Sequence, residues 1–145
     1  MPEKETLERA EEDKEEGKAP STQAGEFVRE EIEHVREGKH GARSAKQAIA
    51  IGLSKARRAG VKLKPPKKGS KQMRKQAARD LKKGKKKSAK KSAKRSRATS
   101  RALKREGRSA ASKRALSRQA HAAAQKRSAA SRSRSAKKAA KTRKK

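Results

Sequence analysis

Large hydrophobic side chains are concentrated in one short stretch of the chain, residues 21–66. All the Ile and Val residues and the single Phe lie there. Four hydrophobic residues recur at spacings of four, four and three, which predicts a helix over about residues 22–37: Ala24, Val28, Ile32 and Val35. Phe27 lies at the margin of this stripe, and Gly38 is placed to end the helix because Gly adopts the left-handed conformation at little cost.

A second helix is predicted over about residues 44–59. Ser44 begins it, and Gln47 three residues later completes a capping box. Six residues fall within one arc at 100° per residue: Ala45, Ala48, Ile49, Gly52, Leu53 and Ala56. Gly in mid-helix costs ~1 kcal/mol relative to Ala, so we expect Gly52 to permit close approach of a partner helix.

The two predicted helices form an αα-hairpin. We expect Ile49 and Leu53 to pack on Ile32 and Val35. Hydrophobic cores of this size are marginally stable alone. The hairpin is therefore expected to need a protein partner, a second copy or nucleic acid to be well ordered.

Outside the hairpin the chain has few residues that could form a core. Leu, Ile, Val and Phe together make up 13 of 145 residues. Below ~20% of these residues, a highly charged chain usually cannot offset its conformational entropy by burial. The expected fold class is a mostly disordered chain with one small all-α module, its tail partly helical and more so on binding.

Charge divides the chain into three segments. Residues 1–20 carry 8 acidic and 4 basic side chains, and we expect an acidic disordered leader that solubilises the chain or covers the tail until nucleic acid displaces it. Residues 21–66, the two-helix module, carry 5 acids and 10 bases. Residues 67–145 carry 2 acids and 33 bases, a low-complexity tail rich in Lys, Arg, Ala and Ser.

A segment as basic as this tail is expected to bind nucleic acid phosphate. Contacts of Lys and Arg with the phosphate backbone carry no sequence information. Phe27 is the only aromatic residue, so stacking of unpaired bases is not expected, and without Cys there is no zinc finger. That leaves backbone-driven binding to a duplex, or unspecific binding to structured RNA, and of the two partners we favour DNA.

The candidate nucleic-acid-binding residues lie in the module and along the tail. Those in the module surround or follow the start of the second helix, where free N–H groups favour an anion: Lys39, Arg43, Ser44, Lys46, Lys55, Arg57 and Arg58. Those in the tail are Lys85, Lys86, Lys87, Lys90, Lys91, Lys94, Arg95, Arg97, Arg101, Lys104, Arg105, Arg114, Arg118, Lys126, Arg127, Lys137 and Lys138.

Other kinds of site are not expected. His34, His40 and His121 lack a Cys or carboxylate at metal-ligand spacing. There is no phosphate-binding glycine loop or nucleophile motif, so we predict no enzyme, no cofactor and no metal. No hydrophobic stretch is long enough to span a membrane, and the chain is expected in the cytoplasm, associated with the nucleoid.

Residues 46–60 read K-Q-A-I-A-I-G-L-S-K-A-R-R-A-G and follow Gly38-Lys39-His40-Gly41. This segment resembles the signature of a small bacterial family of unknown function, and the resemblance covers about residues 26–64. Members of that family are often labelled plasmid-stabilisation or DNA-binding proteins. The resemblance implies a bacterial source. The tail is similar to the C-terminal domain of linker histone and to bacterial histone-like proteins.

The sequence thus predicts a histone-like protein that binds and compacts duplex DNA without sequence preference and that aids plasmid maintenance. Two alternatives stay open. One is a basic protein that binds structured RNA or associates with the ribosome. The other is an adaptor whose two-helix module binds a protein partner, or a second copy of itself, while the tail localises it.

Overall fold

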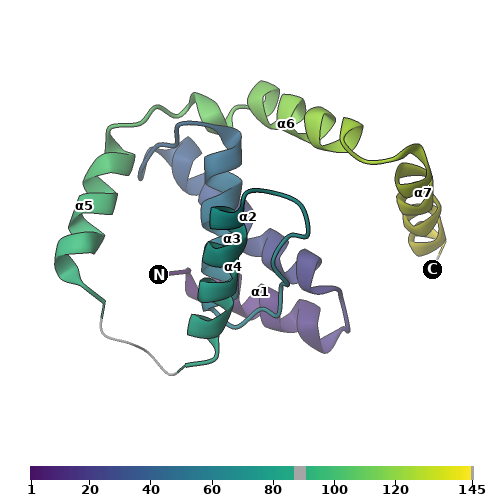
Figure 1. The fold of residues 1–145 in the computed structure, drawn as a ribbon, viewed down its shortest axis with the longest axis horizontal. Helices are drawn as coiled ribbons and strands as arrows, with labels where there is room; N and C mark the ends of the chain where they lie inside the picture. Colours follow the sequence, from purple (N-terminus) through teal and green to yellow (C-terminus); the bar gives the residue numbers. More distant parts are fainter. Residues whose placement is uncertain (87–90, 145) are drawn as a thin grey trace.

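Helices make up most of residues 1–86 and 91–144, the part of the chain that the computed structural model describes (Figure 1). These residues contain no strand. Seven α-helices and one short 3₁₀ helix follow one another: α1 Lys4–Glu15, α2 Pro20–Glu37, α3 Ala45–Arg58, α4 Lys71–Gly84, α5 Ala93–Lys104, η1 Ser109–Ala111, α6 Lys113–Gln125 and α7 Ala129–Arg143. None of these helices is long and hydrophobic enough to cross a membrane.

The prediction of a mostly disordered chain with a single small module is wrong. The low content of large hydrophobic residues misled it, because Ala, Arg and Lys are among the best helix formers. Four helices of the tail also begin at a serine whose hydroxyl accepts a hydrogen bond from the backbone N–H three residues later: Ser70, Ser92, Ser112 and Ser128. Such caps satisfy backbone groups that would otherwise lack partners at a helix start.

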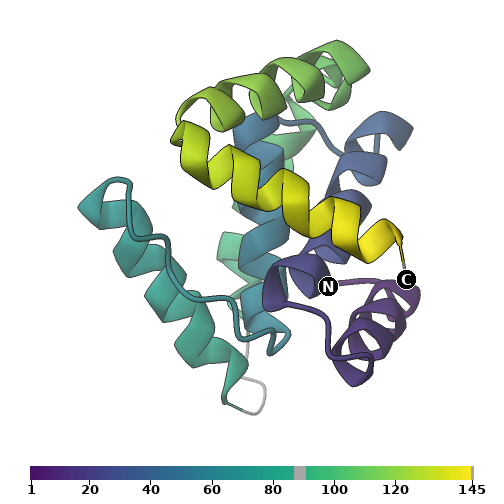
Figure 2. The same ribbon diagram turned by 90° about the vertical axis from the view of Figure 1, so that its right-hand side faces the viewer.

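The first four helices pack together around α2 and α3 (Figures 1 and 2). α1 lies against α2, and α4 lies against α3 on its other side. One hydrophobic cluster contains Ala10, Ala24, Phe27, Ala56 and Val61, with Leu53 and Leu63 packed against it. A second contains Val35, Ala42, Ala48, Ala110 and Ala111, with Ile32 packed against it. The expected contact of Leu53 with Ile32 and Val35 is therefore replaced by packing against the Phe27 cluster.

Phe27 lies at the centre of the buried face of α2, not at its margin. The most buried positions of this face are Ala24, Phe27, Glu31 and Val35. Val28 and Ile32, which the hydrophobic stripe placed centrally, are only half-buried. The face is rotated because α1 and α3 cover α2 from two sides and because Glu31 finds cationic partners inside.

Gly52 allows α2 and α3 to approach closely, as the sequence predicts. A Cβ atom at this position would lie 2.6 Å from Val28 Cα and 3.0 Å from the carbonyl oxygen of Phe27. Real Cβ atoms do not approach other atoms so closely, so the helix spacing depends on the missing side chain.

The N-terminal segment is a helix that packs on the body, and its prediction as a disordered leader is wrong. Thr6 and Ala10 of α1 are buried against α2. Arg9 lies 3.9 Å from Glu26, and Glu3 accepts hydrogen bonds from His34 and Lys39. The acidic segment therefore covers α2, and its hydrogen bond to the described part of the tail is the one that the Lys91 ammonium donates to Met1 Sδ.

The two acidic residues of the tail both lie where the tail meets the hairpin. Asp80 of α4 is 1% exposed and accepts hydrogen bonds from Ser54 at 2.7 Å, Arg58 at 2.8 Å and Gln76 at 3.2 Å. Glu106 lies 3.7 Å from Arg43 and is partly exposed. Asp80 thus fixes α4 on α3, while Glu106 marks a second, more exposed attachment.

Backbone contacts hold this second attachment in place. The N–H of Gly41 donates to the carbonyl of Leu103 at 2.9 Å, and the N–H of Ala42 donates to that of Gly107 at 3.0 Å. Arg36 Nε donates to the carbonyl of Ala111, which is fully buried in the second cluster. The tail therefore contributes to the core as far as residue 111.

Replacing Gly52 with Ala is expected to destabilise the fold, since the added methyl group collides with the backbone of α2. Gly25 is the matched control. It lies in α2, is exposed, and a Cβ there meets nothing within 4 Å. Gly25→Ala should raise the free energy of unfolding by about 0.5–1 kcal/mol, and Gly52→Ala should lower it. Urea unfolding followed by far-UV circular dichroism measures both, and equal shifts would contradict the close approach.

Asp80→Asn is expected to lower the free energy of unfolding by about 2–3 kcal/mol, because it removes charge-assisted hydrogen bonds from a buried site. Glu106→Gln makes the same chemical change at a partly exposed residue whose partner is 3.7 Å away. That variant should cost under about 1 kcal/mol. Comparable losses in the two variants would show that Asp80 does not anchor α4.

Candidate nucleic-acid interface

The last three helices, α5 to α7, carry the basic surface of the molecule. Residues 91–144 contain 20 Lys and Arg residues against one acidic residue, Glu106. No residue of α5, α6 or α7 is buried. Figure 1 shows α5 on one side of the helical body and α6 leading away from it to α7 on the other.

All the predicted tail residues that the structure describes are exposed. Lys85 and Lys86 follow α4, and the others lie on or beside the last three helices: Lys91, Lys94, Arg95, Arg97, Arg101, Lys104, Arg105, Arg114, Arg118, Lys126, Arg127, Lys137 and Lys138. Lys87 and Lys90 lie outside the described residues. The structure therefore displays the described charges to solvent along one continuous segment of the chain.

The loop before α3 is turned toward the protein itself. Lys39 lies 3.0 Å from Glu37 and 3.1 Å from Glu3. Hydrogen bonds to Glu37 and then to Glu3 raise the pKa of Lys39, and hydrogen bonds from His34 and then Lys39 lower the pKa of Glu3. Arg43 remains 80% exposed beside Glu106.

The start of α3 is capped by its own residues. Ser44 Oγ accepts a hydrogen bond from the Gln47 N–H at 3.2 Å, so the predicted cap forms. Gln47 Oε1 accepts a hydrogen bond from the N–H of Arg43. In an ideal capping box it would accept from the N–H of Ser44 instead. The backbone of residues 103–107 packs on the loop, while Lys39, Arg43, Ser44 and Lys46 stay exposed. Lys39 is engaged by Glu3 and Glu37, which leaves Arg43 and Lys46 as the exposed cations that do not face the N-terminal carboxylates.

The three cations predicted along α3 point into contacts within the body. Lys55 Nζ lies 2.6 Å from Glu31, and Arg58 Nε donates to Asp80. Arg57 is 8% exposed and donates to the carbonyl of Leu63, and burial lowers its pKa. These side chains stabilise the fold, and the basic surface lies elsewhere.

Sequence reasoning omitted several exposed cations on α6 and α7. They are Lys113, Arg132, Arg134, Lys141, Arg143 and Lys144. For those after Ser128, the run of good helix formers behind a serine cap could have predicted a helix with exposed cations.

The structure also brings a carboxylate next to two of the three histidines, which was not predicted from the sequence. Donor atoms of Glu31, His34 and His40 lie within 4.8 Å of one another, so the prediction that no carboxylate converges with the histidines is wrong. His121 is exposed on α6. The error arose because His40 follows Gly38, whose left-handed conformation (φ 78°) turns the chain back over α2.

Comparison with known proteins identifies one related family. Residues 14–68 match a family of unknown function (DUF6496), a segment that covers α2, α3 and the end of α1. No curated protein and no solved structure matches the chain. The similarity thus covers the two central helices of the body, while α4 and the basic helices α5 to α7 lie outside it.

Ser112→Ala is expected to destabilise α6, because it removes the hydroxyl that accepts a hydrogen bond from the N–H of Ala115 at 3.2 Å. The expected loss is about 1 kcal/mol of local helix stability. Ser117→Ala, an exposed change within the same helix, should stabilise it by about 0.5 kcal/mol. Amide hydrogen exchange of residues 113–125 measures both effects, and faster exchange in the Ser117 variant would contradict this account.

Proposed function

We propose that this protein binds duplex DNA without sequence preference through its last three helices and compacts it. One observation carries the proposal: residues 91–144 carry 20 basic residues against one acid, and α5 to α7 in this segment have no buried residue, whereas most acidic side chains of residues 1–84 pair with cations of residues 1–84 themselves. Duplex DNA presents a negative charge about every 1.7 Å along its axis, and Lys and Arg neutralise it by releasing counterions.

The length of these helices suits contact with the phosphate backbone. α7 has 15 residues, so it extends about 22 Å. Contacts of Lys and Arg with phosphates carry no sequence information, so these helices can meet the duplex at any base sequence. α5 and α7 lie on opposite sides of the body (Figure 1), and one molecule could therefore contact two duplex segments. Contacts of this kind would draw DNA together.

Duplex is preferred to single strands because the chain offers no stacking platform. Phe27, its single aromatic residue, is 1% exposed in the core. Binding to single strands normally relies on bases stacked on exposed aromatic side chains. The body of the molecule, whose central helices match the family of unknown function, would serve mainly to order and present the tail. A cytoplasmic, nucleoid-associated role that includes plasmid maintenance is part of this proposal.

Neutralising α7 is expected to weaken DNA binding more than the same charge change on the body. The test variant replaces four exposed cations of α7 with Gln, which preserves helix propensity: Arg132, Arg134, Lys137 and Lys138. The control replaces four exposed lysines of the body: Lys4, Lys14, Lys46 and Lys62. Fluorescence anisotropy of a labelled duplex at several salt concentrations gives the slope of log K against log salt.

Each lost phosphate contact lowers this slope by about 0.9, so the α7 variant should lose about 3–4 and the control less than about 1. Equal losses would show that net charge alone, and not α7, determines binding. Competition identifies the partner. If structured RNA displaces the protein from DNA at equal phosphate concentration, the assignment of DNA is wrong.

A further inference from the structure

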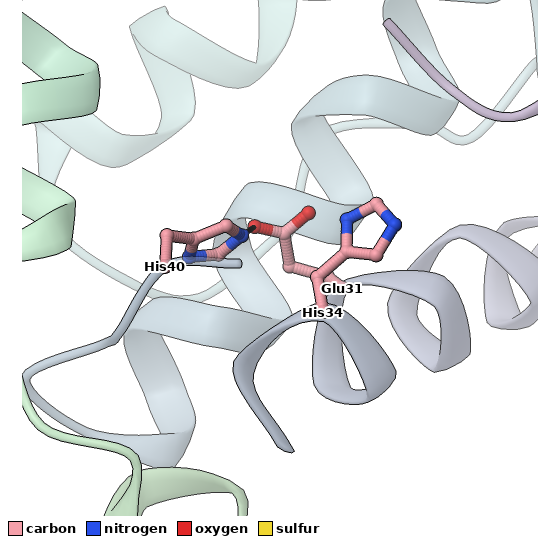
Figure 3. Close-up of side chains that lie close together, drawn as sticks. All are labelled: Glu31, His34 and His40. Carbon is pink, nitrogen blue, oxygen red and sulfur yellow. Dashed lines mark ion pairs between the residues drawn. The ribbon is translucent and has the colours of Figure 1, made fainter. Parts of the chain in front are cut away.

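Two histidines and a buried glutamate meet where α2 and the loop that follows it face α3. Figure 3 shows the Glu31 carboxylate between the rings of His34 and His40. The side chains of the three residues are 1%, 12% and 16% exposed. We propose that Glu31, His34 and His40 bind a divalent transition metal ion, with Zn²⁺ the best match. This site is independent of the proposed DNA binding.

The hydrogen bonds of His40 favour a metal ligand. Its Nδ1 lies 2.9 Å from the carbonyl oxygen of Gly41, and its Nε2 lies 2.9 Å from Glu31 Oε1. Both neighbours are acceptors, yet a neutral imidazole has only one N–H. With the proton on Nδ1, the lone pair of Nε2 points at the carboxylate. Either a second proton or a metal ion then satisfies both groups, and the metal ion is the case proposed here. A ligand histidine typically donates its other N–H to a carbonyl or carboxylate in this way.

His34 is oriented by the same kind of contact. Its Nε2 lies 2.9 Å from Glu3 Oε1, a carboxylate brought in by the segment before α1. Its Nδ1 lies 4.0 Å from Glu30 Oε1. When Nε2–H donates to Glu3, Nδ1 is left with a lone pair on the side of the cluster. Glu31 and His34 are three residues apart on α2, which places both side chains on one face of the helix.

The cluster also has an excess of buried negative charge. Glu30 and Glu31 are 3% and 1% exposed in their side chains. Among the described residues Glu30 Oε1 and Glu31 Oε2 have no hydrogen-bond partner of good geometry, although Lys55 Nζ lies 3.6 Å and 2.6 Å from them. The Lys55 ammonium, together with the more distant amino group of Met1, thus faces two buried carboxylates. The orphaned Glu30 Oε1, beside His34, is the candidate for a fourth ligand.

The donor set determines which metal fits. Imidazole nitrogens suit Zn²⁺, Cu²⁺, Ni²⁺ and Fe²⁺, whereas Mg²⁺ and Ca²⁺ prefer oxygen alone. Two histidines and one carboxylate are a common ligand set for Zn²⁺, with bonds of about 2.0–2.2 Å. Tetrahedral coordination then needs donor atoms roughly 3.3–3.4 Å apart. The present separations, all within 4.8 Å, require only small side-chain movements.

An ion can reach the site from the surface. Glu31 and His40 line a groove of about 430 Å³ between α3 and α5, which Ile51, Thr99 and Leu103 also line. A bound ion would join α2 to the loop at His40, and the next residue, Gly41, holds α5 through Leu103. Metal binding would therefore strengthen the attachment of the basic tail to the body.

The test uses the full chain after removal of metals with a chelator. Isothermal titration with ZnCl₂ should show one strong site, MgCl₂ should show none, and Co²⁺ should give visible absorption bands of a low-coordinate nitrogen and oxygen site. His34→Ala and His40→Ala should each weaken Zn²⁺ binding by at least about 100-fold, since even loss of an outer hydrogen bond costs ~10–100-fold. His121→Ala, which removes the exposed histidine of α6, should have no effect.

Several outcomes would overturn the proposal. Absence of Zn²⁺ binding to the natural chain would do so without any variant, as would a Co²⁺ spectrum identical to that of the hydrated ion. Equal Zn²⁺ affinity in the His34, His40 and His121 variants would place the metal elsewhere. Far-UV circular dichroism establishes that each variant is folded. The anisotropy assay measures DNA binding and not metal binding. A negative result with Zn²⁺ therefore leaves the DNA proposal to be judged separately.

Discussion

The fold depends on two cations of α3 that pair with buried carboxylates on the helices at its two sides. Lys55 reaches Glu31 of α2, and Arg58 reaches Asp80 of α4. Removing one partner of a buried ion pair leaves an uncompensated charge, which typically costs 3–5 kcal/mol. A core made largely of Ala releases little free energy by burial. Charge pairing and close backbone contact therefore determine how the helices assemble.

The predicted hairpin shows what periodicity can and cannot reveal. Two helices lie at Pro20–Glu37 and Ala45–Arg58, close to the expected ranges, because their caps and hydrophobic spacing are local properties of the sequence. Periodicity misplaced the buried face of α2, because it treats Glu31 as a surface residue. Burial of a charge depends on partners such as His40 and Lys55, and those are fixed only by the folded chain.

The tail shows the opposite error, since composition predicted disorder where serine caps and helix formers produce α4 to α7. Composition did not separate the exposed cations from those paired within the body, because it placed both groups in one set of nucleic-acid-binding residues. Those of residues 91–144 face solvent, whereas Lys55, Arg57 and Arg58 turn inward. Distinguishing the two groups required knowledge of where acidic and carbonyl partners lie. No local pattern around Arg57, for example, indicates that Leu63 will accept its hydrogen bond.

Charge marks residues 67–145 as one basic tail, but the burial of Ala110 and Ala111 beside Val35 divides that tail into two parts. Insertions or deletions between Asp80 and Ala111 would disturb packing, because both ends of that segment are fixed in the body. After Ser112 no described residue is buried, and beyond the part of α6 that meets α3 and η1 mainly charge and helix propensity remain to be maintained. Sequence drift and changes in length should be tolerated there. Related chains are therefore expected to keep a body of constant size and to vary in the length of their basic extension.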